Sequence, residues 1–223
     1  LAHAPGRVIT VEDPVEYDLV GVSQVEVDTA DKVMFGSVLR NILRSDPDVI
    51  MIGEMRDYES ADVGIKAALT GHLVLSSLHT NSAAGAVTRL IDMGVQPFLV
   101  AATVRLCVAQ RLLRRLCPKC RKRRELTAAE AKAIGHEPLA GSVVYDPAGC
   151  EFCSQRGYRG RVGVFEVLPM TLDMQRLVVD GAGEADITQA ARDAGAASVH
   201  EDAIDKLLSG KTSLEEVMTT ALA

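Results

Sequence analysis

The sequence has few aromatic residues: it contains no tryptophan and only four Phe and four Tyr in 223 residues. Nucleic-acid-binding modules stack bases on aromatic rings, so this scarcity argues against nucleic acid as a partner. No apolar run approaches the roughly 18 residues of a membrane-spanning helix, since the best candidate, residues 98–109, is interrupted by Arg105. No secretory signal is recognisable. With 48% hydrophobic and 24% charged residues, the composition predicts an ordinary soluble chain of one or two domains.

A phosphate-binding loop is also missing. The pattern G-x-x-x-x-G-K-[ST], whose backbone N–H groups hold nucleotide phosphates, does not occur. The single Gly-Lys-Thr, at residues 210–212, has Asp205 where the first glycine belongs. Residues 200–208 before it predict a helix, whereas a phosphate loop follows a strand. We therefore expect no nucleotide at Gly210–Thr212.

Charge is distributed unevenly along the chain. The formal net charge is −6, but residues 111–161 contain twelve Lys/Arg against five Asp/Glu and so carry +7. A basic segment in an acidic chain predicts a local anionic partner: nucleic acid, phospholipid headgroups or an acidic protein face. The alternative is a solvated, self-repelling surface.

The run Val49–Ile52 predicts a strand buried on both faces of a parallel sheet, because it has no polar side chain and ends at Gly53. Glu54, Arg56 and Asp57 follow it directly. Ligands of open α/β sheets bind beyond the carboxyl ends of the strands. An acid there could hold a metal-bound phosphate or orient an attacking water. The alternative is a core strand that ends in a solvated turn.

Similar strand-and-loop units lie on both sides. Residues 7–11 predict a strand followed by Glu12, Asp13 and, two residues after Pro14, Glu16. Residues 72–77 predict a strand followed by His79. Residues 22–27 alternate as a strand with one wet face. Since the loops of a parallel sheet emerge at one edge, the acids and His79 should converge, unless these are only polar turns.

Helices are predicted between these strands. One starts at Asp31 and has an apolar face that includes Val33 and Met34. Arg40 and Arg44 lie four residues apart on this helix and therefore on one face, where they could bind an anion or form a solvated surface. A second covers residues 59–69. A third begins after Asn81 or Ser82, either of which can cap it. We also predict that the helical region before the first cysteine pair ends near Leu116 and includes Cys107 as a small buried residue.

Three segments together resemble a known family. They are ITVEDPVEY (residues 9–17), LRNILRSDPDVIMIGEMRD (39–57) and TGHLVLSSLHTNSAAGAVTRL (70–90). In order and spacing they resemble the Asp box, Walker B motif and His box of the secretion ATPases, more narrowly those of type II secretion and type IV pilus assembly. The family also has glycine where most P-loop enzymes place a magnesium-binding Asp, and Gly53 matches that departure.

The resemblance implies roles for these residues. Glu54 would polarise the attacking water, Glu12, Asp13 and Glu16 would place Mg²⁺ and water, and His79 would contact the terminal phosphate of ATP. The nucleotide-facing residues would be Arg40, Arg44, Gly53 and Arg56, the first two possibly toward a neighbouring subunit of a hexamer. The family's phosphate loop lies upstream of the Asp box, so the sequence is expected to be the carboxyl-terminal part of a longer protein and, by itself, inactive.

Two C-x-x-C pairs give the second strong signal. Cys117 and Cys120 are separated by 29 residues from Cys150 and Cys153. Each pair can offer two thiolates to one tetrahedral metal, so we predict a Zn²⁺ site, which the family resemblance supports. A redox dithiol and two disulfides are the alternatives. Thr127 and Glu130 between the pairs predict a capping box, as do Ser213 and Glu216 further on.

The sequence therefore predicts an α/β chain in three parts. Residues 1–116 would be a partial RecA-like P-loop NTPase core, 117–168 a tetracysteine zinc module with a returning strand at 162–167, and 169–223 an all-helical subdomain. Its helices are expected at 172–179, 187–194, 199–208 and 214–222. The expected function is ATP hydrolysis that powers type II secretion. The protein would lie in the cytoplasm, peripheral to the bacterial inner membrane and bound to secretion platform proteins there. The alternatives are a pilus assembly ATPase and a non-catalytic zinc-stabilised binding module with a basic surface.

Overall fold

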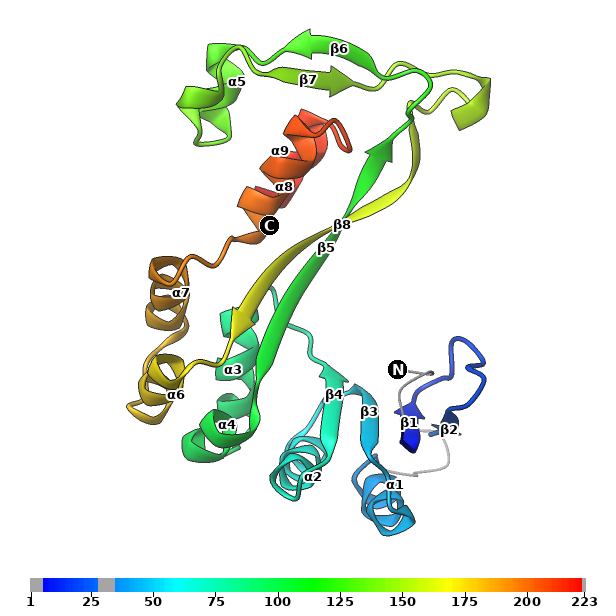
Figure 1. Cartoon of the computed structure of the whole chain (residues 1–223), viewed down its shortest axis with the longest axis vertical. Helices are drawn as coiled ribbons and strands as arrows, with labels where there is room; N and C mark the ends of the chain where they lie inside the picture. The colour runs from blue at the N-terminus through cyan, green and yellow to red at the C-terminus, as the bar shows by residue number, and fades with distance from the viewer. Residues whose placement is uncertain (1–5, 28–34, 222–223) are drawn as a thin grey trace. The chain divides into compact units, whose positions relative to one another are not determined.

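The computed structural model describes residues 6–27 and 35–221 (Figure 1). The chain forms two compact units. The first contains the residues up to Cys107 together with Pro169–Ala190, and the second contains Val108–Leu168 together with the residues from Ala191 onwards. The three-part division at residues 116 and 168 stays a prediction.

A four-stranded parallel sheet lies at the centre of the first unit, with the order β2-β1-β3-β4. Its strands are β1 (Val8–Glu12), β2 (Ser23–Glu26), β3 (Val49–Glu54) and β4 (Leu73–Ser77). Strand β3 lies between β1 and β4, and its Ile50 and Ile52 are each 1% exposed. All four predicted strands and their parallel arrangement are confirmed.

Among the described residues, four helices lie in the part of the first unit before Cys107: α1 (Phe35–Ile42), α2 (Tyr58–Leu69), α3 (Ala83–Asp92) and α4 (Pro97–Thr103). Two more, α6 (Leu172–Val179) and α7 (Glu184–Asp193), begin in its later segment, Pro169–Ala190. Of the predicted first helix, Asp31, Val33 and Met34 lie outside the described residues. Asp57 caps α2 by accepting from the backbone N–H of Ser60 at 2.8 Å. Ser82, rather than Asn81, caps α3.

The predicted helix ending near Leu116 is wrong. Residues 106–116 form strand β5 (Leu106–Leu116), which pairs with β8 (Tyr158–Pro169), and the predicted strand at 162–167 lies within β8. Leucine and arginine favour helix locally, but pairing with a distant strand overrides this weak preference. The first residues of β5 alternate between exposed and buried, as a strand requires. Cys107 is buried there, as predicted, and burial raises the pKa of its thiol to about 11.

The second unit combines β5 and β8 with a two-stranded antiparallel sheet of β6 and β7 and further helices (Figure 1). These are β6 (Lys122–Glu125), β7 (Val143–Asp146), α5 (Ala128–Ala133), α8 (Val199–Leu208) and α9 (Leu214–Ala221). The predicted capping box of Thr127 and Glu130 is confirmed at α5. The core of this unit includes Leu113, Leu126, Val144, Val164, Ile204, Leu207 and Val217. The helices predicted near the carboxyl end are present, although Leu222 lies outside the described residues.

Gly210–Thr212 forms the turn between α8 and α9, and the helix predicted before it is confirmed as α8. Gly210 has φ +67°, and the backbone N–H of Lys211 donates to the carbonyl of Lys206 at 2.9 Å. The hydroxyl of Thr212 is buried and donates to the carbonyl of Arg114 at 2.9 Å. Within residues 6–27 and 35–221, no helix is both long enough and apolar enough to cross a bilayer.

Candidate active site and metal centre

The loops that follow β1, β3 and β4 bring four predicted site residues together. Nε2 of His79 lies 2.7 Å from Oε2 of Glu54. The guanidinium of Arg56 donates to the other oxygen of Glu54 and reaches Oδ2 of Asp13 at 3.4 Å. These residues meet because the strands are parallel, so that their carboxyl ends share one edge. The sheet thus gathers two acids, an arginine and a histidine.

The end of β3 is shaped by its two neighbours. The pairing of β3 with β4 shifts register between Ile52 and Glu54, and the carbonyl of Gly53 accepts a hydrogen bond from the Ser77 hydroxyl at 2.6 Å. A Cβ at position 53 would lie 3.2 Å from the carbonyl oxygen of Val11. Gly53 therefore suits the close approach of β1, and the Glu54 side chain emerges from a fixed backbone.

Electrostatics keep Glu54 ionised. The hydrogen bond from Arg56 lowers its pKa most; partial burial works in the opposite direction, and His79 lowers it further. Glu54 in turn raises the pKa of Arg56. The carboxylate side chain is 15% exposed and that of His79 is 87% exposed. An ionised, mostly shielded acid beside an accessible histidine can accept hydrogen bonds from water or hold a cation.

Glu12 lies at the end of β1, where its Oε1 accepts hydrogen bonds from Thr10 Oγ1 at 2.6 Å and Gln24 Nε2 at 3.0 Å. Gln24 also donates to the carbonyl of Tyr17 at 3.0 Å. Sequence reasoning did not select Gln24, since alternation placed it on the wet face of a strand without showing its partner. Glu16 is exposed in the loop after β1.

Arg40 and Arg44 are not part of this group in the part of the chain that is described. Arg40, in α1, pairs with Glu59 of α2 at 2.8 Å. Arg44 is exposed and lies in the 3₁₀ turn η2 (Leu43–Ser45). The α-helix ends before it, so the four-residue spacing from Arg40 no longer places the two arginines on one α-helical face. Both side chains are accessible enough to meet a ligand from outside the unit.

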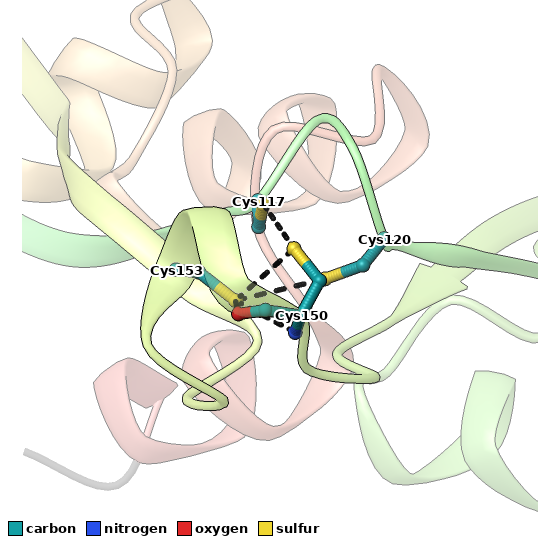
Figure 2. A group of neighbouring side chains, drawn as sticks. All are labelled: Cys117, Cys120, Cys150 and Cys153. Carbon is teal, nitrogen blue, oxygen red and sulfur yellow. Dashed lines mark hydrogen bonds between the residues drawn. The ribbon is translucent and has the colours of Figure 1, made fainter.

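The four paired cysteines converge from two loops, as Figure 2 shows. Their sulfur atoms all lie within 4.8 Å of one another, with 3.9 Å between Cys117 and Cys150, 3.8 Å between Cys120 and Cys153, and 3.7 Å between Cys150 and Cys153. All four are free thiols, which excludes the predicted alternative of two disulfides in this structure. Tetrahedral zinc with Zn–S bonds of about 2.3 Å requires sulfur atoms about 3.8 Å apart. The cluster fits zinc.

Backbone groups support the cysteine cluster. Amide N–H groups of Cys150 and Gly157 each donate to the sulfur of Cys153 at 3.3 Å, and that of Gly149 donates to Cys120 at the same distance. Burial disfavours the Cys153 thiolate, but the amides of Cys150 and Gly157 and the side chains of Cys150 and Cys120 outweigh it, and the pKa of Cys153 falls to about 6. Gly157 has φ +75°, and a Cβ there would lie 2.5 Å from Cβ of Pro147. The loop therefore needs glycine at this position.

Two basic side chains pack on Phe152, which lies between Cys150 and Cys153 in the sequence. The ammonium of Lys119 and the guanidinium of Arg159 lie 4.3 Å and 3.9 Å from the ring centroid of Phe152. Arg159 also donates to the carbonyl of Phe152 at 2.8 Å. These cations offset the −2 charge that a zinc tetrathiolate would carry.

This is an α/β protein that shares its fold with the ATPase DotB and with the pilus retraction motor PilT. It superposes on the Legionella pneumophila ATPase DotB with a TM-score of 0.67 and 22% identity, over 100% of this chain and 53% of that one. The pilus retraction motor PilT with bound ADP gives a TM-score of 0.67 and 23% identity, over 96% and 52% of the two chains.

The chain belongs to the type II/IV secretion system protein family, whose pattern matches residues 1–219. It is 48% identical over 212 residues to type II secretion system protein E of Aeromonas hydrophila, covering 95% of this chain and 42% of the relative. It is 46% identical over 215 residues to the type IV pilus assembly ATPase PilB of Myxococcus xanthus, covering 95% and 38%. The chain thus spans about two fifths of the length of these relatives.

Proposed function

We propose that the intact protein hydrolyses ATP with Mg²⁺ and uses the energy to power type II protein secretion. The observation that carries this proposal is the ionised carboxylate of Glu54, hydrogen-bonded to His79 and Arg56 at the carboxyl edge of a parallel sheet. Family membership and the fold of PilT, whose structure holds ADP, support it.

In this proposal the unit is part of a RecA-like P-loop core, and each residue has one task. The carboxylate of Glu54 accepts a hydrogen bond from the O–H of the attacking water. The lone pair of the water oxygen then faces the terminal phosphate. Asp13 and Glu16 of the loop after β1, together with Glu12 at the end of that strand, would hold Mg²⁺. His79 donates to the terminal phosphate when it swings from Glu54, which its exposed position permits. Gly53 leaves space at the end of the strand.

Arg56 orients two of these acids, because it contacts both Glu54 and Asp13. Arg40 and Arg44, which lie apart from this group, would face a nucleotide of a neighbouring subunit in a homo-hexamer. Zn²⁺ on the four cysteines would hold the second unit together and take no part in hydrolysis.

The protein would act in the cytoplasm at the inner face of the bacterial inner membrane, docked on platform proteins of the secretion system. Pilus assembly is the alternative function, since PilB and the type II relatives are similarly identical to this chain. A non-catalytic binding module with a basic surface is the alternative from another class. Deletion of the gene for this protein distinguishes secretion from pilus assembly, because the deletion strain would lose either the secreted proteins or the pili.

Glu54→Gln in the intact protein tests catalysis. It should keep ATP binding and lower kcat by about 10²–10⁴-fold, because only the water-orienting charge is lost. Asp62→Asn is the matched control, since Asp62 is an acid of the same unit that pairs only with the surface residue Lys66 among the salt bridges described. It should leave kcat unchanged. Normal turnover in Glu54→Gln would reject the assignment.

A further inference from the structure

Glu184, the first residue of α7, contacts the loop that carries His79. Its Oε1 lies 2.5 Å from Oγ of Ser82, although the two residues are 102 positions apart. Ser82 Oγ already accepts a hydrogen bond from the backbone N–H of Gly85 at 2.8 Å. The Ser82 hydroxyl therefore directs its own proton to Glu184, and the carboxylate fixes the rotamer of the residue that caps α3.

Gly85 provides an independent sign of this contact. It is the third residue of α3 and buried, although glycine is a poor helix former. A Cβ at position 85 would lie 2.8 Å from Ser82 Oγ and 3.2 Å from Glu184 Oε1. Space, rather than backbone conformation, is what glycine supplies here. The negative charge of Glu184 also suits the amino terminus of α3, where the helix dipole is positive.

The cap is closely joined to His79. Thr80 Oγ1 donates to the carbonyl of Ser82 at 3.2 Å, and the backbone N–H of Thr80 donates to the carbonyl of Leu78 at 3.1 Å. The side chain of His79 itself is 87% exposed, so little packing holds it near Glu54. Its position depends mainly on where its loop is anchored, and Ser82 is the anchor three residues away.

We propose that Glu184 is a positioning residue for the His79 loop: through Ser82 it holds α3 and the preceding loop so that His79 meets Glu54. This inference rests on the proposed function, since it deepens the role of the same site. It assigns to α7 an effect, transmitted through Ser82, on the proposed active site at the edge of the sheet.

The test uses the intact protein with Glu184→Ala, Glu184→Gln and the control Asp173→Asn, which changes an exposed acid of α6 that pairs with Arg176. Glu184→Ala should speed amide hydrogen exchange of residues 78–85 about fivefold and lower kcat about three- to tenfold, with KM for ATP unchanged. Glu184→Gln retains an oxygen acceptor and should stay within about twofold of wild type in both readouts. The control should change neither.

A double-mutant cycle sharpens the test. Ser82→Ala with Glu184→Ala should be no worse than Ser82→Ala, because both remove one contact. Additive effects, unchanged exchange in Glu184→Ala, or equal loss in the Gln and Ala variants would overturn the proposal. Failure of the proposed function is separate: it would appear as normal turnover in Glu54→Gln, whereas failure of this inference appears as unchanged exchange while Glu54→Gln is inactive.

Discussion

Glu216 of α9 binds Arg114 of β5 at both its backbone and its side chain, 102 residues away in the sequence. Its two carboxylate oxygens accept from the backbone N–H of Arg114 at 2.6 Å and from Nε at 2.7 Å. Glu216 is 7% exposed, and the contact raises the pKa of Arg114. This pair fastens the last described helix to the long strand of the second unit.

Replacing Glu216 by Ala should destabilise the second unit by about 1.5–3 kcal/mol, the usual value for hydrogen bonds to a charged group. Chemical denaturation measures it. Glu215→Ala is the control: Glu215 is 67% exposed and reaches Arg114 only at 3.5 Å. It should cost at most about 1 kcal/mol. An equal loss of unfolding free energy in the two variants would show that the buried contact of Glu216 stabilises the unit no more than the exposed contact of Glu215 does.

Purified protein should contain close to one equivalent of zinc, bound by Cys117, Cys120, Cys150 and Cys153. Structural zinc contributes about 10–16 kcal/mol in small modules, so Cys120→Ser should lose the metal and unfold the loops around it while sparing the parallel sheet. Elemental analysis and circular dichroism check both points. Cys107→Ala, which removes the remaining cysteine, should keep one equivalent; stable metal-free wild-type protein would contradict the zinc assignment.

The polypeptide 1–223 by itself should neither bind ATP at micromolar concentrations nor release phosphate. Its sequence has no phosphate loop to neutralise the β- and γ-phosphates, and the acids at the sheet edge repel a polyanion. Calorimetry with MgATP and a phosphate-release assay measure these properties. Micromolar binding that disappears in Lys211→Ala would move the phosphate site to the turn between α8 and α9.

The stability contribution of Glu130 should depend on pH. Arg124, at 2.7 Å, and the backbone of Thr127 lower its pKa in the folded protein. A depressed folded pKa stabilises the protein above the unfolded pKa of about 4.3, and this contribution is lost as pH falls through the folded value. Wild type should therefore be more stable than Glu130→Gln by about 1 kcal/mol at pH 7, with the gap closing below about pH 4. A gap that does not change with pH would contradict this account.

Several features could be predicted from the sequence because their causes are local. Runs such as Val49–Ile52 are apolar on both faces, which only a buried strand of a layered sheet accommodates. At the start of α5 the Thr127 hydroxyl accepts a hydrogen bond from the backbone N–H of Glu130, and the Glu130 carboxylate accepts one from the backbone N–H of Thr127. The C-x-x-C spacing places paired sulfurs on one loop, and the structure then brings the two pairs within reach of one metal ion.

Other features were decided only by tertiary structure. The capping box expected from the spacing of Ser213 and Glu216 stays a prediction. The contacts of Glu216 with Arg114 and of the Ser213 hydroxyl with that of Tyr158, at 2.7 Å, could not be read from that spacing. Leucine and arginine predicted a helix before Leu116, yet pairing with β8 makes that segment a strand.

The sequence by itself therefore determined the parallel strands, the order of the acidic and histidine loops and the cysteine pairs. Tertiary structure alone decided that Arg56 lies between Glu54 and Asp13, and that Glu184 reaches Ser82. The physical reason is the range of the interactions. Side-chain periodicity and capping act within a few residues, whereas a contact between segments forms only when the whole fold brings them together and offsets the entropy of closing the chain between them.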